Sequence, residues 1–199
     1  DSVPDLAAAV DDMLQQLGRE PAGVELVRKW VGNGALVLVR RALAGSLEHA
    51  AVDDAEAEAA LELFMSAYAK ADDLTVRYPG VLECLDALQD AGVQLALITN
   101  KPERFIPDLL QEQQLDRYFG WIIGGDTLPQ KKPDPAALLH VMQAAGAGPH
   151  NSLFVGDSRN DMQAAKAAAV PCVALTYGYN HGEDIRLQKP DLVIDNLAE

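Results

Sequence analysis

From residue 78 onward the sequence alternates short apolar runs with helix-forming segments, and this alternation restricts the fold more than any other feature. The apolar runs that predict strands occupy residues 93–98, 121–123, 153–155, 173–175 and 192–194. The segments between them that predict helices cover residues 81–91, 103–113, 135–145 and 158–168. Strands that alternate with helices form βαβ units, in which helices cover both faces of a parallel sheet. We therefore predict an α/β fold.

The first seventy-odd residues have a different pattern, because they contain apolar residues at helical spacing and no strand-like run. Amphipathic helices are predicted at residues 6–17, 24–30 and 35–44, and a further helix begins at Asp53. The composition changes near residues 74–78. The sequence thus predicts a small all-helical domain at residues 1–76 and an α/β domain at residues 77–199.

Polar residues follow three of the predicted strands at the points where these strands end. They are Thr99, Asn100 and Lys101; then Lys131 and Lys132; and then Asp157, Ser158, Arg159 and Asp161. The carboxyl ends of parallel strands meet at one edge of a sheet, where open α/β folds bind their ligands. We therefore expect these side chains to lie close together.

A hydroxyl, an amide, lysines and a pair of carboxylates at one place are suited to phosphate chemistry. Neutral donors and an ammonium bind phosphate oxygens, and carboxylates hold a divalent cation. Mg²⁺ fits best, since it prefers oxygen ligands and binds one or two carboxylates together with waters. Each loop alone has a plainer interpretation: Asp157 and Ser158 also suit a helix cap, and Lys131-Lys132 also suits solvated surface.

Composition and charge restrict the kinds of molecule that the protein is expected to bind. With 16 basic and 30 acidic residues the formal net charge is −14, which disfavours binding to nucleic acid or to acidic membranes. No apolar run is long enough to span a bilayer. Cys84 and Cys172 lack metal or redox spacing, so we expect a reduced, cytoplasmic protein. The expected partner is a small phosphate ester, and the chain is expected to be a monomer or a homodimer.

The segments LITNK, KKPDP and VGDSRND, in this order, resemble the second, third and fourth motifs of the haloacid dehalogenase superfamily of aspartate-nucleophile phosphatases. The segments PDLAAAVD, WVGNG and LTYGYNHGE are similar to those of one group in it, the bacterial phosphoglycolate phosphatases. The resemblance covers nearly the whole chain. It implies a Rossmann-like core, a helical cap domain and Mg²⁺-dependent hydrolysis of 2-phosphoglycolate through an aspartyl-phosphate intermediate.

The resemblance also implies roles for individual core residues. Thr99 would bind the transferring phosphoryl group, with Asn100 beside it. Lys132 would neutralise charge on the phosphate and on the nucleophile. Asp157 would be a ligand of Mg²⁺, with Asp161 in support.

In the cap domain, the resemblance implies that one loop approaches the substrate. This loop contains Gly32, Asn33 and Gly34, which would lie near the carboxylate end of the substrate. A related capped phosphatase or phosphomutase acting on another small phosphate ester remains an alternative, since caps differ among such enzymes.

The first motif of the superfamily, DxDGT, is not present in the sequence, although it carries the nucleophilic Asp and an acid/base Asp. In the family this motif immediately precedes the residues that match residues 1–4, and we expect the chain to be a piece of a longer phosphatase, cut at both ends. The missing strand would lie centrally, between the strands that end at Thr99 and Asp157. We therefore expect either a gap or a collapsed sheet there. If no such motif lies upstream of residue 1, the alternative is a non-catalytic module that binds phosphate or metal.

Overall fold

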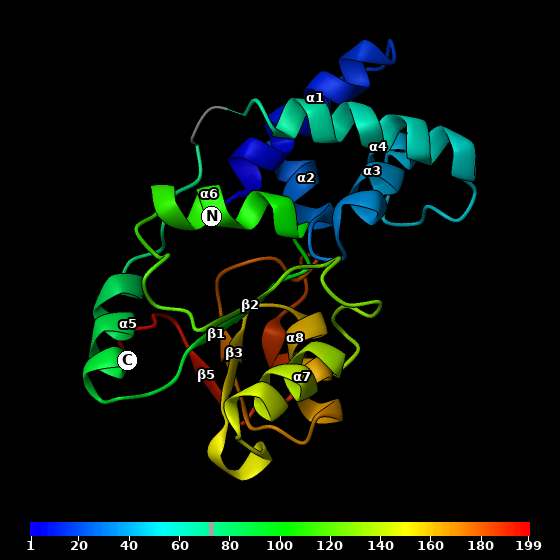
Figure 1. Ribbon diagram of the computed structural model, residues 1–199. Coiled ribbons are helices and arrows are strands. Elements are labelled where there is room, and N and C mark those ends of the chain that lie inside the picture. The colour runs from blue at the N-terminus through cyan, green and yellow to red at the C-terminus, as the bar shows by residue number, and fades with distance from the viewer. Residues whose placement is uncertain (72–73) are drawn as a thin grey trace. The chain divides into compact units, whose positions relative to one another are not determined.

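The computed structural model describes residues 1–71 and 74–199, and these form two compact units. One unit comprises Asp1–Val76 and the other Arg77–Glu199 (Figure 1). No helix in the described residues combines the length and the apolar character needed to cross a membrane.

In its described residues the first unit contains four helices. They are α1 (Val3–Gln16), α2 (Val24–Trp30), α3 (Ala35–Ala44) and α4 (Asp54–Tyr68). Asp53 caps α4, because its side chain accepts the backbone N–H groups of Ala55 and Glu56. Gly45 ends α3 in the left-handed conformation that glycine adopts without strain. The four predicted helices are confirmed, with boundaries shifted by a few residues.

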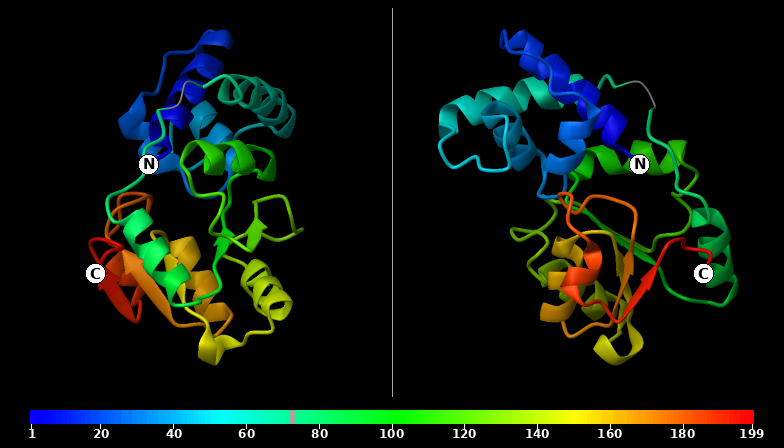
Figure 2. Two further views of the ribbon diagram at one scale, coloured as in Figure 1. Left: turned by 60° about the vertical axis from the view of Figure 1, so that its left-hand side comes forward. Right: turned by 180° about the vertical axis from the view of Figure 1, so that it is seen from behind.

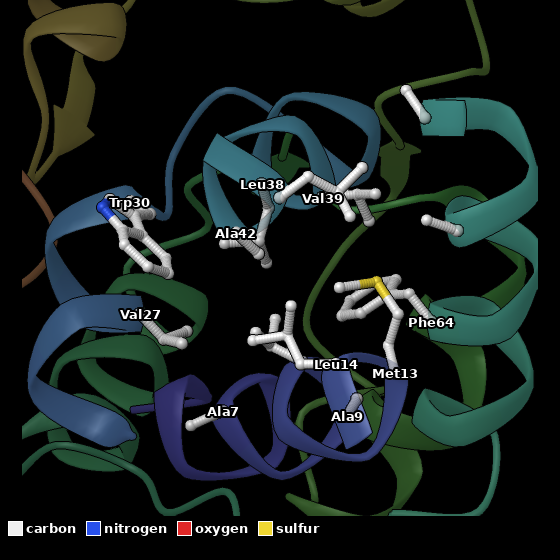
Figure 3. Close-up of a cluster of buried hydrophobic side chains, with 14 residues drawn as sticks. Ala7, Ala9, Met13, Leu14, Val27, Trp30, Leu38, Val39, Ala42 and Phe64 are labelled. Atoms are coloured by element: carbon white, nitrogen blue, oxygen red, sulfur yellow. The ribbon is translucent and has the colours of Figure 1, made fainter. Parts of the chain in front are cut away.

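Apolar side chains from all four helices form one core in this unit. Figure 3 shows Met13 and Leu14 of α1 pointing toward Phe64 of α4 and toward Leu38 of α3. Met13 and Phe64 are fully buried. A buried side chain of this size contributes about 1.5–3 kcal/mol to folding, so the helical unit has a core of its own.

The second unit alternates strands and helices as the sequence predicts. In chain order it contains α5 (Val81–Asp90), β1 (Ala96–Ile98), η1 (Glu103–Phe105), α6 (Ile106–Glu112), β2 (Trp121–Ile123), α7 (Ala136–Ala145), η2 (Pro149–Asn151), β3 (Phe154–Gly156), α8 (Arg159–Ala167), β4 (Cys172–Leu175), η3 (Ile185–Gln188) and β5 (Leu192–Ile194). Helix α5 lies on one side of the strands and helices α7 and α8 on the other (Figures 1 and 2).

Two elements are shorter than the sequence predicts. The strand expected at residues 93–98 begins only at Ala96. The helix expected at residues 103–113 is divided into the 3₁₀ turn η1 and the α-helix α6. The division follows from Pro107, which is tolerated in the first turn of α6 but would interrupt a helix that began at Glu103.

The strands form two parallel sheets instead of one continuous sheet. Strand β1 pairs with β2, and β4 pairs with both β3 and β5. Leu97 lies opposite Ile122 in the first sheet, and Val155 lies opposite Val173 in the second. In the described residues β1 and β3 do not pair, so the gap expected between the strand before Thr99 and the strand before Asp157 is confirmed.

Burial follows the pairing of the strands. All four residues of β4, which has a neighbour on each side, are buried. In contrast, β1 is only half-buried, and in β3 the side chain of Val155 is 40% exposed. None of the residues of α5 is buried. Strands of parallel sheets are normally covered on both faces, so β1, β3 and α5 have apolar surface that the described residues leave uncovered.

On the side of α7 and α8 the two sheets share a core. Met162 and Ala165 of α8 pack with Cys172 of β4, and Ile98 of β1 and Phe154 of β3 pack against the same cluster. This shared core holds the carboxyl ends of β1 and β3 within reach of the same side chains.

Candidate active site

Lys132 connects the two sheets at their carboxyl ends. Its Nζ donates hydrogen bonds to the carbonyl oxygen of Ile98 at 2.7 Å and to Oδ1 of Asp161 at 2.6 Å. Only 11% of the Lys132 side chain and 5% of the Asp161 side chain is exposed. An ammonium and a carboxylate with so little solvent interact strongly, so the position of this lysine is well defined.

Asn100 and Thr99 lie just after β1 and support this arrangement. The Nδ2 of Asn100 donates a hydrogen bond to the carbonyl oxygen of Lys132 at 2.9 Å. The N–H of Thr99 donates to the carbonyl oxygen of Ile123 at 2.9 Å, which extends the pairing of β1 with β2. Oγ1 of Thr99 accepts a hydrogen bond from the N–H of Lys101 at 3.1 Å. The loop after β1 is thereby fixed beside the Lys132 backbone.

Asp161 uses both of its carboxylate oxygens within the protein. Besides the bond to Lys132, its Oδ2 accepts hydrogen bonds from Oγ of Ser158 at 2.6 Å and from the N–H groups of Ser158 and Asp157, at 3.0 and 3.2 Å. Burial alone would raise the pKa of Asp161, but the Lys132 ammonium and these hydrogen bonds hold the pKa below its usual value. Asp161 is therefore an ionised partner that positions Lys132.

The same contacts show that Ser158 and Asp161 form a capping box at the start of α8. The capping interpretation, made for Asp157 and Ser158, thus holds for Ser158, and its partner in the capping box is Asp161. The box does not include Asp157, which precedes the cap and lies on the wall of a cavity of about 420 Å³.

Asp157 is a half-buried carboxylate with an unusual pKa. Burial, followed by the charge of Asp161, raises the pKa of Asp157 to about 7, although Lys132 and the N–H of Tyr179 act in the opposite direction. The Tyr179 N–H donates to Oδ2 of Asp157 at 3.2 Å. The charge of Asp157 is therefore only partly compensated by the protein.

These residues fit a Mg²⁺ ion. A divalent cation beside Asp157 would stabilise its ionised form, which is the form that burial and Asp161 disfavour. Within the described ranges, no group of three or more His, Cys, Asp or Glu side chains is arranged to hold a metal. That is compatible with Mg²⁺, which commonly binds one or two carboxylates and keeps waters or takes substrate phosphate oxygens.

The structure does not place all of the predicted basic side chains beside Asp161. Lys131 is exposed, and Arg159 lies 4.0 Å from Glu183, at the limit of an ion pair. Lys132 is the lysine that contacts the buried carboxylate Asp161.

Gly32, Asn33 and Gly34 form the loop between α2 and α3 in the helical unit. Gly32 and Gly34 have positive φ angles of 125° and 90°. In the part of the chain that the structure describes, the buried Oδ1 of Asn33 has no hydrogen-bond partner. A buried Oδ1 of this kind is an unmet acceptor, which needs a donor and not a carboxylate. The expected role of this loop in binding therefore stays a prediction.

Sequence reasoning missed the residues that support Asp157 from the loop after β4. Gly178 and Tyr179 pack against its carboxylate, and the buried side chain of Asn180 bonds to the first residue of α8. Apart from their place in a segment that resembles the family, no sequence pattern indicated these residues, because their contacts depend on how β4 lies beside β3.

Comparison with known proteins identifies the family of this chain. Residues 1–175 match the haloacid dehalogenase-like hydrolase family. The chain belongs to this family. Among its relatives, a phosphoglycolate phosphatase of Pseudomonas putida is 68% identical over 99% of this chain and 72% of its own length. Phosphoglycolate phosphatase 1 of Pseudomonas aeruginosa is 66% identical over 100% of this chain and 73% of its own length.

One solved structure is also similar to this chain. It is a predicted phosphoglycolate phosphatase from Haemophilus somnus, with a TM-score of 0.92 and 36% identity over 99% of this chain and 89% of that one. The α/β fold and the family are thereby established for this chain.

Proposed function

We propose that this chain provides the cap and most of the core of a Mg²⁺-dependent phosphatase that hydrolyses 2-phosphoglycolate to glycolate and phosphate. The chemistry is supported chiefly by one observation, the Lys132 ammonium held between the Ile98 carbonyl and Asp161 beside the carboxylate of Asp157. The choice of substrate is supported by the 68% identity to the phosphoglycolate phosphatase of Pseudomonas putida.

Two residues of this chain contact the phosphate in the proposed reaction. The Thr99 hydroxyl donates a hydrogen bond to a phosphate oxygen. Lys132 offsets the negative charge that collects on the phosphate and on the attacking carboxylate, and Asp161 keeps its ammonium in place. Asn100 fixes the Lys132 backbone.

The nucleophile belongs to a strand outside residues 1–199, between β1 and β3. Its carboxylate attacks phosphorus, and the bond from phosphorus to the glycolate oxygen breaks. A second carboxylic acid gives its proton to that oxygen, then takes a proton from the water that hydrolyses the aspartyl-phosphate. The products are glycolate, inorganic phosphate and the regenerated carboxylate.

Asp157 is the proposed ligand of Mg²⁺, with Asp161 in support through Lys132 and the α8 cap. Bound Mg²⁺ supplies Lewis-acid stabilisation of phosphate charge. The Asp157 carboxylate fits this role because it lies on a cavity wall and keeps uncompensated charge.

The proposal also covers the substrate specificity, the cellular location and the oligomeric state of the protein. The helical unit is assigned as the cap, and its Gly32–Gly34 loop is assigned to the carboxylate end of the substrate. We place the protein in a reducing cytoplasm because both Cys84 and Cys172 are free thiols. A monomer or a homodimer stays the expected oligomeric state.

The proposal is tested with the protein that carries the first motif in addition to these residues. Initial rates are compared on 2-phosphoglycolate and on sugar phosphates over a range of Mg²⁺ concentrations. We expect the highest kcat/KM on 2-phosphoglycolate and no turnover without Mg²⁺. The Asp157→Asn variant should lose the Mg²⁺-dependent turnover. A preference for sugar phosphates would contradict the substrate, and unchanged activity of Asp157→Asn at limiting Mg²⁺ would contradict the metal site.

A further inference from the structure

We propose that Asn180 is a positioning residue for Asp157. It acts through the segment of residues 176–180 that follows β4, called here the β4 loop. This inference rests on the proposed function, in which Asp157 is the ligand of Mg²⁺.

The side-chain amide of Asn180 connects two backbone segments through hydrogen bonds. It is buried, with 8% of the residue exposed. Its Oδ1 accepts a hydrogen bond from the N–H of Arg159 at 2.8 Å, and its Nδ2 donates one to the carbonyl oxygen of Glu183 at 2.9 Å. Since Arg159 is the first residue of α8, the amide of Asn180 ties the β4 loop to the chain just after Asp157.

The β4 loop in turn packs tightly against the Asp157 carboxylate. The Tyr179 N–H donates to Oδ2 of Asp157 at 3.2 Å. A Cβ atom on Gly178, which has a φ of +115°, would lie only 1.8 Å from the same oxygen. The backbone of the loop therefore forms a wall that leaves no room for Asp157 to turn toward it, and the position of the loop sets the direction of the carboxylate.

Loss of the hydrogen bonds made by the Asn180 side chain would allow the β4 loop to move away from Asp157. The Asp157 side chain borders a cavity of about 420 Å³, which gives the carboxylate space to leave its position once the loop moves. Groups that orient a metal ligand without touching the metal typically contribute about 10–100-fold to metal affinity. We therefore expect Asn180 to affect the binding of the metal more than the chemical step.

The test uses the protein that carries the first motif, with Asn180→Ala, Asn180→Asp and, at an exposed position, the control Asn151→Ala. Asn180→Asp keeps the acceptor for the Arg159 N–H and loses the donor to Glu183. Asn151 also accepts a backbone hydrogen bond, from Gly148 at 2.7 Å, but it lies in η2, away from the cavity lining. Mn²⁺ serves as a paramagnetic probe, and its binding is measured by electron paramagnetic resonance without substrate.

Asn180→Ala should weaken Mn²⁺ binding by about 10–100-fold and raise the Mg²⁺ concentration for half-maximal rate by a similar factor. Its kcat at saturating Mg²⁺ should fall much less. Asn180→Asp should be intermediate, and Asn151→Ala should bind Mn²⁺ like the wild type. Unchanged Mn²⁺ affinity in whichever Asn180 variant folds, with only a lower Tm, would overturn the proposal and leave Asn180 as a purely structural residue.

Asp157→Asn distinguishes this failure from a failure of the proposed function. We expect it to abolish Mn²⁺ binding. If it does so and the Asn180 variants bind normally, only the positioning role is wrong. If Asp157→Asn binds Mn²⁺ normally, the metal assignment is wrong, and the Asn180 proposal fails with it.

Discussion

Among single residues, the two neighbouring lysines of the loop before α7 provide a matched comparison. Lys132 is nearly buried against Asp161, whereas Lys131 is exposed. Removing one electrostatic donor from a site that stabilises developing charge typically costs about 10²–10³-fold in kcat. We predict a loss of this size for Lys132→Ala on 2-phosphoglycolate and a rate near wild type for Lys131→Ala. Equal losses for both variants would mean that the wrong lysine has been assigned.

The raised pKa of Asp157 predicts how pH and Mg²⁺ affect stability. Because folding raises this pKa from its usual value to about 7, the protonated form is favoured in the folded protein. Its stabilising effect is complete below the usual pKa of about 3.9 and is lost as pH rises through about 7. Mg²⁺ binds the ionised form, so the increase in Tm that Mg²⁺ produces should be larger at pH 8 than at pH 6.

Thermal unfolding with and without Mg²⁺ at these two pH values measures this effect. Asp157→Asn is the control, because it cannot titrate and should show no such difference. An equal increase in Tm at both pH values in the wild type would contradict the assignment of Asp157.

At this scale the sequence predicted which residues follow the strands, because polar residues at the carboxyl ends of parallel strands point to a site. It did not predict that Lys132 pairs with Asp161 and not with Asp157. That pairing depends on the Ser158 cap, which turns Asp161 toward Lys132. The contribution of Asn180 was also not predictable, since its partners, Arg159 and Glu183, are brought near it only by the folded chain.

At the scale of elements, helical spacing and apolar runs predicted nearly all helices and strands. Apolar residues at helical spacing indicate a helix that is buried on one face, and a continuous apolar run indicates a strand that is buried on both faces. Two boundaries were wrong, and Pro107 at the start of α6 explains one of them. The loop between α2 and α3 was assigned by resemblance alone, and its role stays a prediction.

Asn33→Ala tests this α2–α3 loop as a specificity element. The part of 2-phosphoglycolate beyond the phosphate is a carboxylate, which needs a donor such as the Nδ2 of Asn33. The buried Oδ1 of Asn33, itself an acceptor, has no partner in the described residues. We predict that the variant raises KM for 2-phosphoglycolate and leaves the hydrolysis of a small generic ester such as p-nitrophenyl phosphate nearly unchanged. Parallel losses on both substrates, with a lower Tm, would show that the loop is structural.

For the whole molecule, the arrangement of strands explains why one part of the fold is incompletely buried. Residues of β4, flanked by β3 and β5, are all buried, whereas β1 and β3 each have an edge without a partner strand in the described residues. Strand positions alone do not reveal this, because apolar runs do not report which strands become neighbours. The gap was expected only from the family resemblance and from the absent DxDGT motif.

The same gap predicts how residues 1–199 behave when they are expressed alone. Leu153, just before β3, and Val155, within it, are 61% and 40% exposed, and unpaired strand edges favour association between chains. Each apolar side chain left uncovered forfeits about 1.5–3 kcal/mol, and a domain is stable by only about 5–15 kcal/mol. A few such side chains, on β1, β3 and α5, are enough to remove that margin.

We therefore predict that residues 1–199 alone aggregate or form a molten state, bind a hydrophobic dye, and show no phosphatase activity with Mg²⁺ present. The control is the same chain extended to include the first motif, which should unfold cooperatively and hydrolyse 2-phosphoglycolate. The comparison uses thermal unfolding, dye binding and turnover on both proteins under the same conditions. Cooperative unfolding together with turnover from residues 1–199 would contradict the placement of the nucleophile strand between β1 and β3, because that strand would then be needed for neither stability nor chemistry.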